Sequence, residues 1–292
     1  MTVIAVNADR PRLATGSLPF PIVPGTPVTI MLHGYRYTPA SPRKDPHLTI
    51  YAGLPGSQDS RTLSWPRRLG LTGARPGIGF GWHADGTIWS AYAGAERAGL
   101  ALADLIAGLR AQGAGPVNLF GHSLGCRVAL SSLPHLRAAD VGRIVLMSAA
   151  ALRGQATAAL ATPAGRAAAV LNVTSRENDL YNKAFELLIF RAGDLTLGAG
   201  LDAPNAVTLQ IDHPHHREGL RALGFPTAAP VRRVCHWSAY MRPGLFPLYR
   251  AFLHRPASLT LADLRRALRA DAAPRWSRLI ASPLLGARLA AE

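Results

Sequence analysis

Short apolar runs alternate with amphipathic stretches along most of this chain. Runs of four to six apolar residues bounded by glycine, proline or polar residues are typical of strands buried on both faces of a sheet. Short runs of this kind lie at 3–6, 28–32, 77–82, 117–120, 143–147, 169–174 and 206–211, and a longer β-like run at 13–20 is broken by Gly16. The clearest helical spacing lies between Ala91 and Leu109. Strands that alternate with helices predict an α/β fold with a mostly parallel central sheet and helices on both faces.

Two stretches between the predicted strands are less regular. Residues 38–76 are rich in Pro, Ser, Gly and Arg and contain one short helical stretch, Trp65–Leu69, which Ser64 would cap. Residues 149–168 are rich in alanine and predict a helical crossover. A connection as long as the first is unusual inside a compact domain, so we expect both stretches to form a small cap beside a functional site.

The chain predicts one main domain and a C-terminal extension. Its 292 residues, 48% of them hydrophobic, can bury a large core, and residues 1–256 contain all the predicted strands. Residues 257–292 are expected to form a helical extension packed on the body. Within it, Leu261, Leu264 and Leu268 share one face of a predicted helix.

The charge of the chain, formally +15, comes almost entirely from arginine, because Lys44 and Lys183 are the only lysines. The arginines are scattered and form no run of five or six, so we expect no nucleic-acid partner. The first residues lack a basic segment followed by a long apolar one, and no apolar run reaches the roughly 20 residues that span a bilayer. We therefore expect a cytoplasmic protein without a transmembrane segment. The two cysteines, Cys126 and Cys235, have no metal-ligand spacing, so no metal site is expected.

The chemistry of the chain is predicted first by Gly121-His122-Ser123-Leu124-Gly125, which lies between a strand and a helix. A serine in a G-x-S-x-G turn of this kind sits on a sharp bend that exposes its hydroxyl as a nucleophile. The bend holds the serine in a strained conformation, and side chains at the two glycine positions would collide across it. Ser123 is therefore the candidate nucleophile.

A second motif follows the strand at 28–32, which ends in His33-Gly34-Tyr35. An acyl-transfer site needs N–H donors for the oxyanion, and one of them comes from a loop in this position. We expect the backbone N–H groups of Tyr35 and Leu124 to form this oxyanion hole. His33 and His122 each adjoin a tight turn, and we expect both to be structural.

A serine nucleophile needs a base, and the base needs an orienting acid. Asp179 lies a few residues beyond the strand at 169–174 and is the candidate acid, although an aspartate before a helix also serves as an N-cap. Glu177 is the fallback acid. The candidate base is His236, which follows an apolar approach and precedes aromatic residues. His213, the fallback base, lies in a polar, proline-broken segment that predicts an exposed loop.

Together these motifs resemble the α/β-hydrolase superfamily, in particular serine esterases and lipases such as bacterial hydrolases of undefined substrate. The resemblance covers roughly residues 25–255. The motifs that carry it are His33-Gly34-Tyr35, Gly121-His122-Ser123-Leu124-Gly125, Asn178-Asp179 and His236-Trp237-Ser238-Ala239-Tyr240. It implies a serine hydrolase that cleaves a carboxylic ester or thioester through an acyl-enzyme, with Ser123, Asp179 and His236 as its triad and no cofactor. The stretch between residue 211 and His236 is longer than the corresponding stretch in such proteins.

Two alternatives remain open at this point. An acyltransferase would use the same triad with an alcohol or amine in place of water. A non-catalytic protein could keep the hydrolase scaffold and use its basic surface to bind an anionic partner. The modest size of the cap predicts a small or medium acyl substrate, and the sequence leaves the oligomeric state undetermined.

Overall fold

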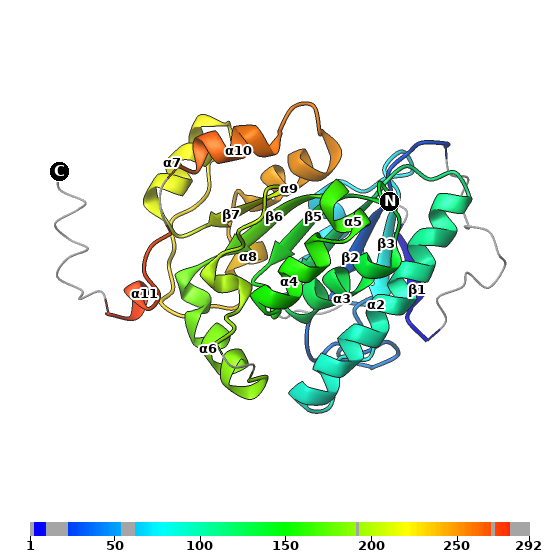
Figure 1. Cartoon of the computed structure of the whole chain (residues 1–292), viewed down its shortest axis with the longest axis horizontal. Helices are drawn as coiled ribbons and strands as arrows, with labels where there is room; N and C mark the ends of the chain where they lie inside the picture. Colours follow the sequence, from blue (N-terminus) through cyan, green and yellow to red (C-terminus); the bar gives the residue numbers. More distant parts are fainter. Residues whose placement is uncertain (1–2, 10–22, 54–61, 191–192, 270–271, 281–292) are drawn as a thin grey trace.

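A seven-stranded parallel sheet forms the centre of the protein (Figure 1). The structure is a computed structural model that describes residues 3–9, 23–53, 62–190, 193–269 and 272–280. The strand order is β1-β3-β2-β4-β5-β6-β7, and every neighbouring pair is parallel. The strands are β1 (Val3–Asn7), β2 (Thr29–Leu32), β3 (Gly77–Gly81), β4 (Val117–His122), β5 (Val141–Met147), β6 (Ala169–Thr174) and β7 (Ala206–Gln210). The predicted α/β class is confirmed, whereas the run predicted at 13–20 lies outside the described residues.

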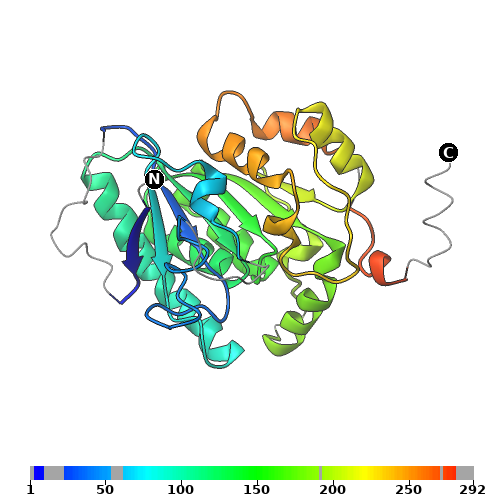
Figure 2. The same cartoon turned by 180° about the vertical axis from the view of Figure 1, so that it is seen from behind.

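Helices cover both faces of the sheet, because neighbouring side chains of each strand enter different cores (Figures 1 and 2). In β2, Ile30 and Leu32 pack into one core and Met31 into the other. The first core contains side chains of α2 (Ile88–Ala111), α3 (Leu124–Ser132), α4 (Arg153–Leu160), α5 (Pro163–Ala167) and α6 (Asp179–Leu188). The second contains side chains of α1 (Trp65–Leu69), α7 (Pro214–Ala222), α8 (Ser238–Met241), α9 (Leu245–His254) and α10 (Leu261–Ala267).

Two of these helices have side-chain caps at their N-termini, and the sequence predicts the first of them. The Ser64 side chain accepts a hydrogen bond from the N–H of Arg67 at the start of α1, and Gly70 ends that helix with a φ of 67°. At the start of α10, Thr260 and Asp263 form a reciprocal capping box. The two segments are therefore helical for local reasons that their sequences already contain.

The segment that follows β7 differs from the prediction. The sequence predicts an exposed loop around residues 212–217, but α7 begins at Pro214 and continues to Ala222. Proline fits the first turn of a helix because the N–H that it lacks would have no partner there. The helix also packs closely on α10, since a Cβ on Gly219 would lie 1.9 Å from the Ala267 carbonyl oxygen. The polar residues and Pro214 in this segment therefore belong to the start of a helix and not to a loop.

The C-terminal part of the chain returns to the body. Helix α10 packs against α7 and β7. In the last described segment, 272–280, the Trp276 N–H donates a hydrogen bond to the Asp179 carboxylate at the start of α6. This segment ends in α11 (Ser277–Ile280). The division into a domain at 1–256 and an extension at 257–292 stays a prediction. No helix in the described ranges is both long enough and apolar enough to cross a membrane.

The contact between α3 and β2 gives a test of this packing. A Cβ on Gly125 would lie 2.2 Å from the Leu32 carbonyl oxygen, so we expect Gly125→Ala to lower the free energy of unfolding by about 1–3 kcal/mol or more. The matched control is Gly108→Ala in α2, where the added Cβ meets no atom within 4 Å and should be neutral or stabilising by up to about 1 kcal/mol. Urea unfolding of both variants measures the difference. Equal stability of the two would contradict the packing described.

Candidate active site

A cavity of about 440 Å³ opens at the carboxyl edge of the sheet. Parallel strands deliver the residues that follow them to one edge, and this is where ligands bind in open α/β sheets. The cavity is lined by Tyr35 after β2, Ser123 after β4, Ser148 after β5 and Asn178 after β6, and His236 reaches it from the chain beyond α7. Four strand ends and a distant segment thus supply its polar groups.

Ser123 occupies a strained turn between β4 and α3. Its backbone has a φ of 54° and a ψ of −123°, a conformation that costs a non-glycine residue free energy and persists only where the surroundings impose it. The close approach of Gly125 to the end of β2 imposes it from one side. Across the turn, a Cβ on Gly121 would lie 3.1 Å from the backbone N of Cys126. The serine is almost buried, with 6% of its surface exposed, and lines the cavity.

The loop after β2 lies directly against this serine. A Cβ on Gly34 would lie 2.8 Å from the Ser123 Cβ, so only glycine allows the loop to come this close. The N–H of Arg36 donates to the Ala84 carbonyl at 2.7 Å and fixes the loop beyond Tyr35. Tyr35 and Leu124 both line the cavity, and Leu124 is the first residue of α3, where N–H groups have no partner within the helix.

His33 does not face the cavity and has a structural environment. Its ring stacks on Trp82 with 5.4 Å between the ring centroids, and its Nε2 accepts a hydrogen bond from the Trp82 N–H at 3.1 Å. Complete burial lowers the pKa of His33 to about 3, so the ring is neutral. This agrees with the structural role expected for it.

The His236 ring is oriented by an asparagine. Its Nδ1 lies 2.7 Å from the Asn178 Oδ1, and the Asn178 amide nitrogen donates to the Asn182 Oδ1 at 2.8 Å. Because the Asn178 NH₂ is used in the second bond, its oxygen faces the ring and accepts the Nδ1 proton. The neutral ring therefore has an unprotonated Nε2, the form that a general base requires.

His122, for which the sequence predicts a structural role, also lines the cavity. Its Nε2 donates to the His236 backbone carbonyl at 3.1 Å, and the two rings lie 4.7 Å apart between centroids. Burial lowers the pKa of His122 to about 4. Burial, followed by the nearby His122, holds the pKa of His236 well below 6.5. His122 thus positions the segment that carries His236, and both rings are neutral near pH 7.

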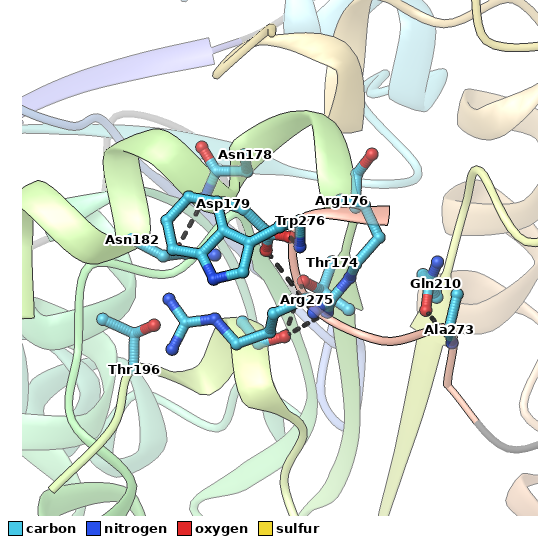
Figure 3. A network of polar contacts seen from close by, with 12 residues as sticks. Thr174, Arg176, Asn178, Asp179, Asn182, Thr196, Gln210, Ala273, Arg275 and Trp276 are labelled. Atoms are coloured by element: carbon cyan, nitrogen blue, oxygen red, sulfur yellow. Dashed lines mark hydrogen bonds and ion pairs between the residues drawn. The ribbon is translucent and has the colours of Figure 1, made fainter. Parts of the chain in front are cut away.

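Asp179 does not contact His236, and here the structure corrects the sequence prediction. Its Oδ2 accepts the N–H of Trp276 at 2.8 Å, and its Oδ1 lies 3.4 Å from the Arg176 Nη1 (Figure 3). Successive residues at the start of a helix point about 100° apart, so Asn178 and Asp179 cannot face the same ring. Asn178 takes the place predicted for the acid, and Asp179 binds the C-terminal segment.

The two fallback residues also have other partners. Glu177 forms a buried ion pair with Arg242 and accepts a hydrogen bond from the Ser175 hydroxyl at 3.1 Å. Its backbone carbonyl accepts the N–H of Cys235 at 2.8 Å, which brings the residue before His236 to the loop after β6. His213 precedes α7 as its N-cap residue, and its ring packs against two other histidines, with no part in lining the cavity.

Asn178 and Ser148 are the site residues that sequence reasoning missed. Asn178 lies in the loop already singled out, but its amide carries no charge to mark it as an orienting group. Ser148 has a φ of 44°, and its buried hydroxyl has no hydrogen-bond partner among the described residues. Its only sequence signal is its place directly after an apolar strand.

Serine and histidine share the cavity without being bonded to each other. Among the described residues, no hydrogen bond joins the Ser123 hydroxyl to the His236 ring. The described ranges also contain no group of three histidine, cysteine or acidic residues placed to hold a metal ion. Ser123 and His236 share the cavity with the hydroxyl of Ser148, the neutral ring of His122, two amides and the exposed Arg36.

One family model and several solved structures are similar to parts of this chain. A family model described as a protein of unknown function, DUF726, matches residues 62–189, which include β4, Ser123 and the loop after β6. No curated protein matches the chain. One solved structure, described as esterase PE8, shares 19% sequence identity with a TM-score of 0.35, over 70% of this chain and 93% of that one.

Proposed function

We propose that the protein is a serine hydrolase that cleaves a carboxylic ester or thioester through an acyl-enzyme. The observation that carries the proposal is the shared cavity of a strained serine and an oriented, neutral histidine. Ser123 has the backbone conformation of an exposed nucleophile, and Asn178 fixes the His236 tautomer that can accept a proton.

In the proposed mechanism, the Ser123 hydroxyl attacks the substrate carbonyl and His236 Nε2 takes its proton. The N–H groups of Leu124 and Tyr35 bind the oxyanion that develops. His236 then returns the proton to the leaving group, and an acyl-enzyme forms. His236 Nε2 then takes a proton from water, which attacks the acyl-enzyme carbonyl. The proton returns to Ser123 Oγ as the carboxylic acid product is released. Catalytic hydrogen bonds are often long before substrate binds, so we expect the Ser123–His236 bond to form in the complex.

The orienting residue in this proposal is Asn178 instead of a carboxylate. An amide oxygen holds the imidazole in the required tautomer, as asparagine does in Cys-His-Asn sites. It stabilises the protonated ring less than a carboxylate would, because it carries no charge. We therefore propose slower turnover than that of a serine hydrolase with a full Ser-His-Asp triad.

The lining of the cavity supports an apolar acyl group as the part of the substrate that is bound. Besides the polar groups, the wall consists largely of aromatic and aliphatic side chains, which are those of Tyr37, Ile50, Trp65, Ile88, Tyr181, Phe185, Leu188, Trp237 and Tyr240. A volume of about 440 Å³ is in the range of cavities that hold small molecules. The proposed substrate is an ester with a small or medium acyl chain.

Active-site labelling tests the nucleophile and the base. We expect a fluorophosphonate probe to label the wild type and not Ser123→Ala. His236→Ala should lower kcat on a short p-nitrophenyl ester by about 10³-fold, within the range that a general base contributes. His213→Ala is the matched control and should stay within about twofold of the wild type, since its ring is outside the cavity.

Labelling that survives Ser123→Ala would rule out this serine as the nucleophile. Folded wild-type protein that is never labelled would favour the non-catalytic scaffold.

The pH dependence of kcat/KM tests the orienting residue. A general base works only when neutral, so activity is lost as the pH falls through the pKa of His236. Burial holds that pKa well below 6.5, and the acid limb of the profile should therefore lie below pH 6.5. In Asn178→Asp the new carboxylate favours the protonated ring, and we expect the limb to move to higher pH.

Asp179→Asn is the matched control for this change. Its side chain does not contact His236, so we expect the limb to stay where it is in the wild type. If the acid limb of the kcat/KM profile moves in Asp179→Asn and not in Asn178→Asp, Asp179 and not Asn178 is the residue that orients His236.

A further inference from the structure

Helix α6 has the reverse of the usual arrangement of polar and apolar faces. Surface helices normally bury an apolar stripe and expose polar residues. In α6, Asp179, Asn182 and Glu186 are buried, whereas Leu180 and Leu187 are 52% and 63% exposed. The helix therefore presents apolar side chains to solvent in place of its polar ones.

A network of polar contacts holds the inner face in this orientation (Figure 3). Glu186 accepts hydrogen bonds from Arg275 at 3.1 Å and from the Thr196 hydroxyl at 3.0 Å. Asp179 and Asn182 have the partners already described, Trp276 and Asn178. Buried carboxylates without such partners would be costly, so the network fixes which side of α6 faces outward.

The exposed apolar surface continues beyond α6 to the start of α2. The Trp89 side chain is 57% exposed, and its Nε1 donates to the Leu188 carbonyl at 2.7 Å. In Figures 1 and 2 the C-terminal end of α6 and the N-terminal end of α2 lie at the same end of the molecule. The outer face, as we use the term, consists of Trp89, Leu180, Tyr181, Leu187, Leu188 and Phe190.

The outer face borders the cavity that holds Ser123. Tyr181 and Leu188 belong to both, and Ile88, next to Trp89, lines the cavity as well. The same helix therefore forms part of the apolar wall inside and an apolar surface outside. An apolar group held at that surface would lie beside the apolar interior.

Basic residues outnumber carboxylates on and beside the outer face, where Asp85, four residues before Trp89, is an exposed carboxylate. Lys183 is the one charged residue among the exposed positions of α6, all of which are described, and they include no carboxylate. The cavity lining includes the exposed Arg36, and Arg232 and Arg233 are exposed in the segment before His236. Basic residues around exposed aromatic and aliphatic side chains are typical of proteins that lie on anionic lipid surfaces.

We propose that the outer face docks on an anionic phospholipid surface, so that the cavity receives an ester from the lipid layer. The choice of substrate rests on the proposed hydrolase function, whereas docking does not. A second copy of the chain fits the surface less well, because a two-fold contact would bring the same basic residues together. A lipid surface matches both the apolar area and the charge.

Vesicle binding tests this proposal without catalysis if the lipids are ether-linked and so cannot be hydrolysed. We expect the wild type to bind vesicles of equal parts phosphatidylglycerol and phosphatidylcholine, and to bind pure phosphatidylcholine vesicles more weakly. Higher salt should weaken the binding. The double variant Leu187→Ser/Phe190→Ser should bind about tenfold more weakly, since two exposed apolar side chains outside the cavity are lost.

The matched control is Val23→Ser/Leu100→Ser, which removes two aliphatic side chains that are 69% and 47% exposed. Val23 lies near the opposite end of α2 from Trp89, because its neighbour Gly25 bonds to Gly113. This control should bind vesicles as the wild type does. All three proteins should cleave a soluble short ester equally well.

Three results would overturn docking. The first is a wild type that binds neither kind of vesicle, and the second is an equal loss of vesicle binding in the two double variants. The third is a wild type that binds no vesicle but forms a dimer, with only Leu187→Ser/Phe190→Ser disrupting that dimer. If no protein cleaves the short ester while the binding results are as expected, docking stands and the hydrolase function fails. If the short ester is cleaved and no vesicle is bound, the hydrolase function stands and docking fails.

Discussion

The close approach of α3 to the end of β2 is the constraint on which the site depends. At Gly125 the two backbones leave no room for a side chain, and Gly34 leaves none between the loop after β2 and Ser123. The turn between them must therefore adopt the strained conformation seen at Ser123. These two contacts hold Ser123 at the cavity wall beside Tyr35 and Leu124, whose backbone N–H groups we propose as the oxyanion donors.

The loop after β6 divides its polar residues between two tasks. Asn178 orients the His236 ring, Glu177 pairs with Arg242, and Asp179 binds the backbone of the C-terminal segment. The carboxylates of Glu177 and Asp179 therefore stabilise the fold, whereas the Asn178 amide binds the His236 imidazole. This division also explains the reversed faces of α6, because the helix begins at Asp179 and its buried polar side continues from there.

Local sequence signals predict the sheet and the strained turn at Ser123 well. Apolar runs bounded by glycine and proline give the strands, a capping Ser64 gives α1, and the glycines around Ser123 give the elbow. The partner of the His236 ring could not be predicted, because one residue of helical rotation separates Asn178 from Asp179 and tertiary contacts decide which one faces the ring. The orientation of α6 likewise could not be predicted, because Glu186 is held on the buried side by Arg275, a residue far away in the sequence.

The most direct test of the site is a crystal structure of the protein after reaction with a phosphonate ester. We predict a covalent bond from Ser123 Oγ to phosphorus, a phosphonyl oxygen within hydrogen-bond distance of the Leu124 and Tyr35 N–H groups, and His236 bonded through Nδ1 to the Asn178 oxygen. Phosphorus on another residue, or an Asp179 carboxylate bonded to His236 in place of Asn178, would contradict the site described.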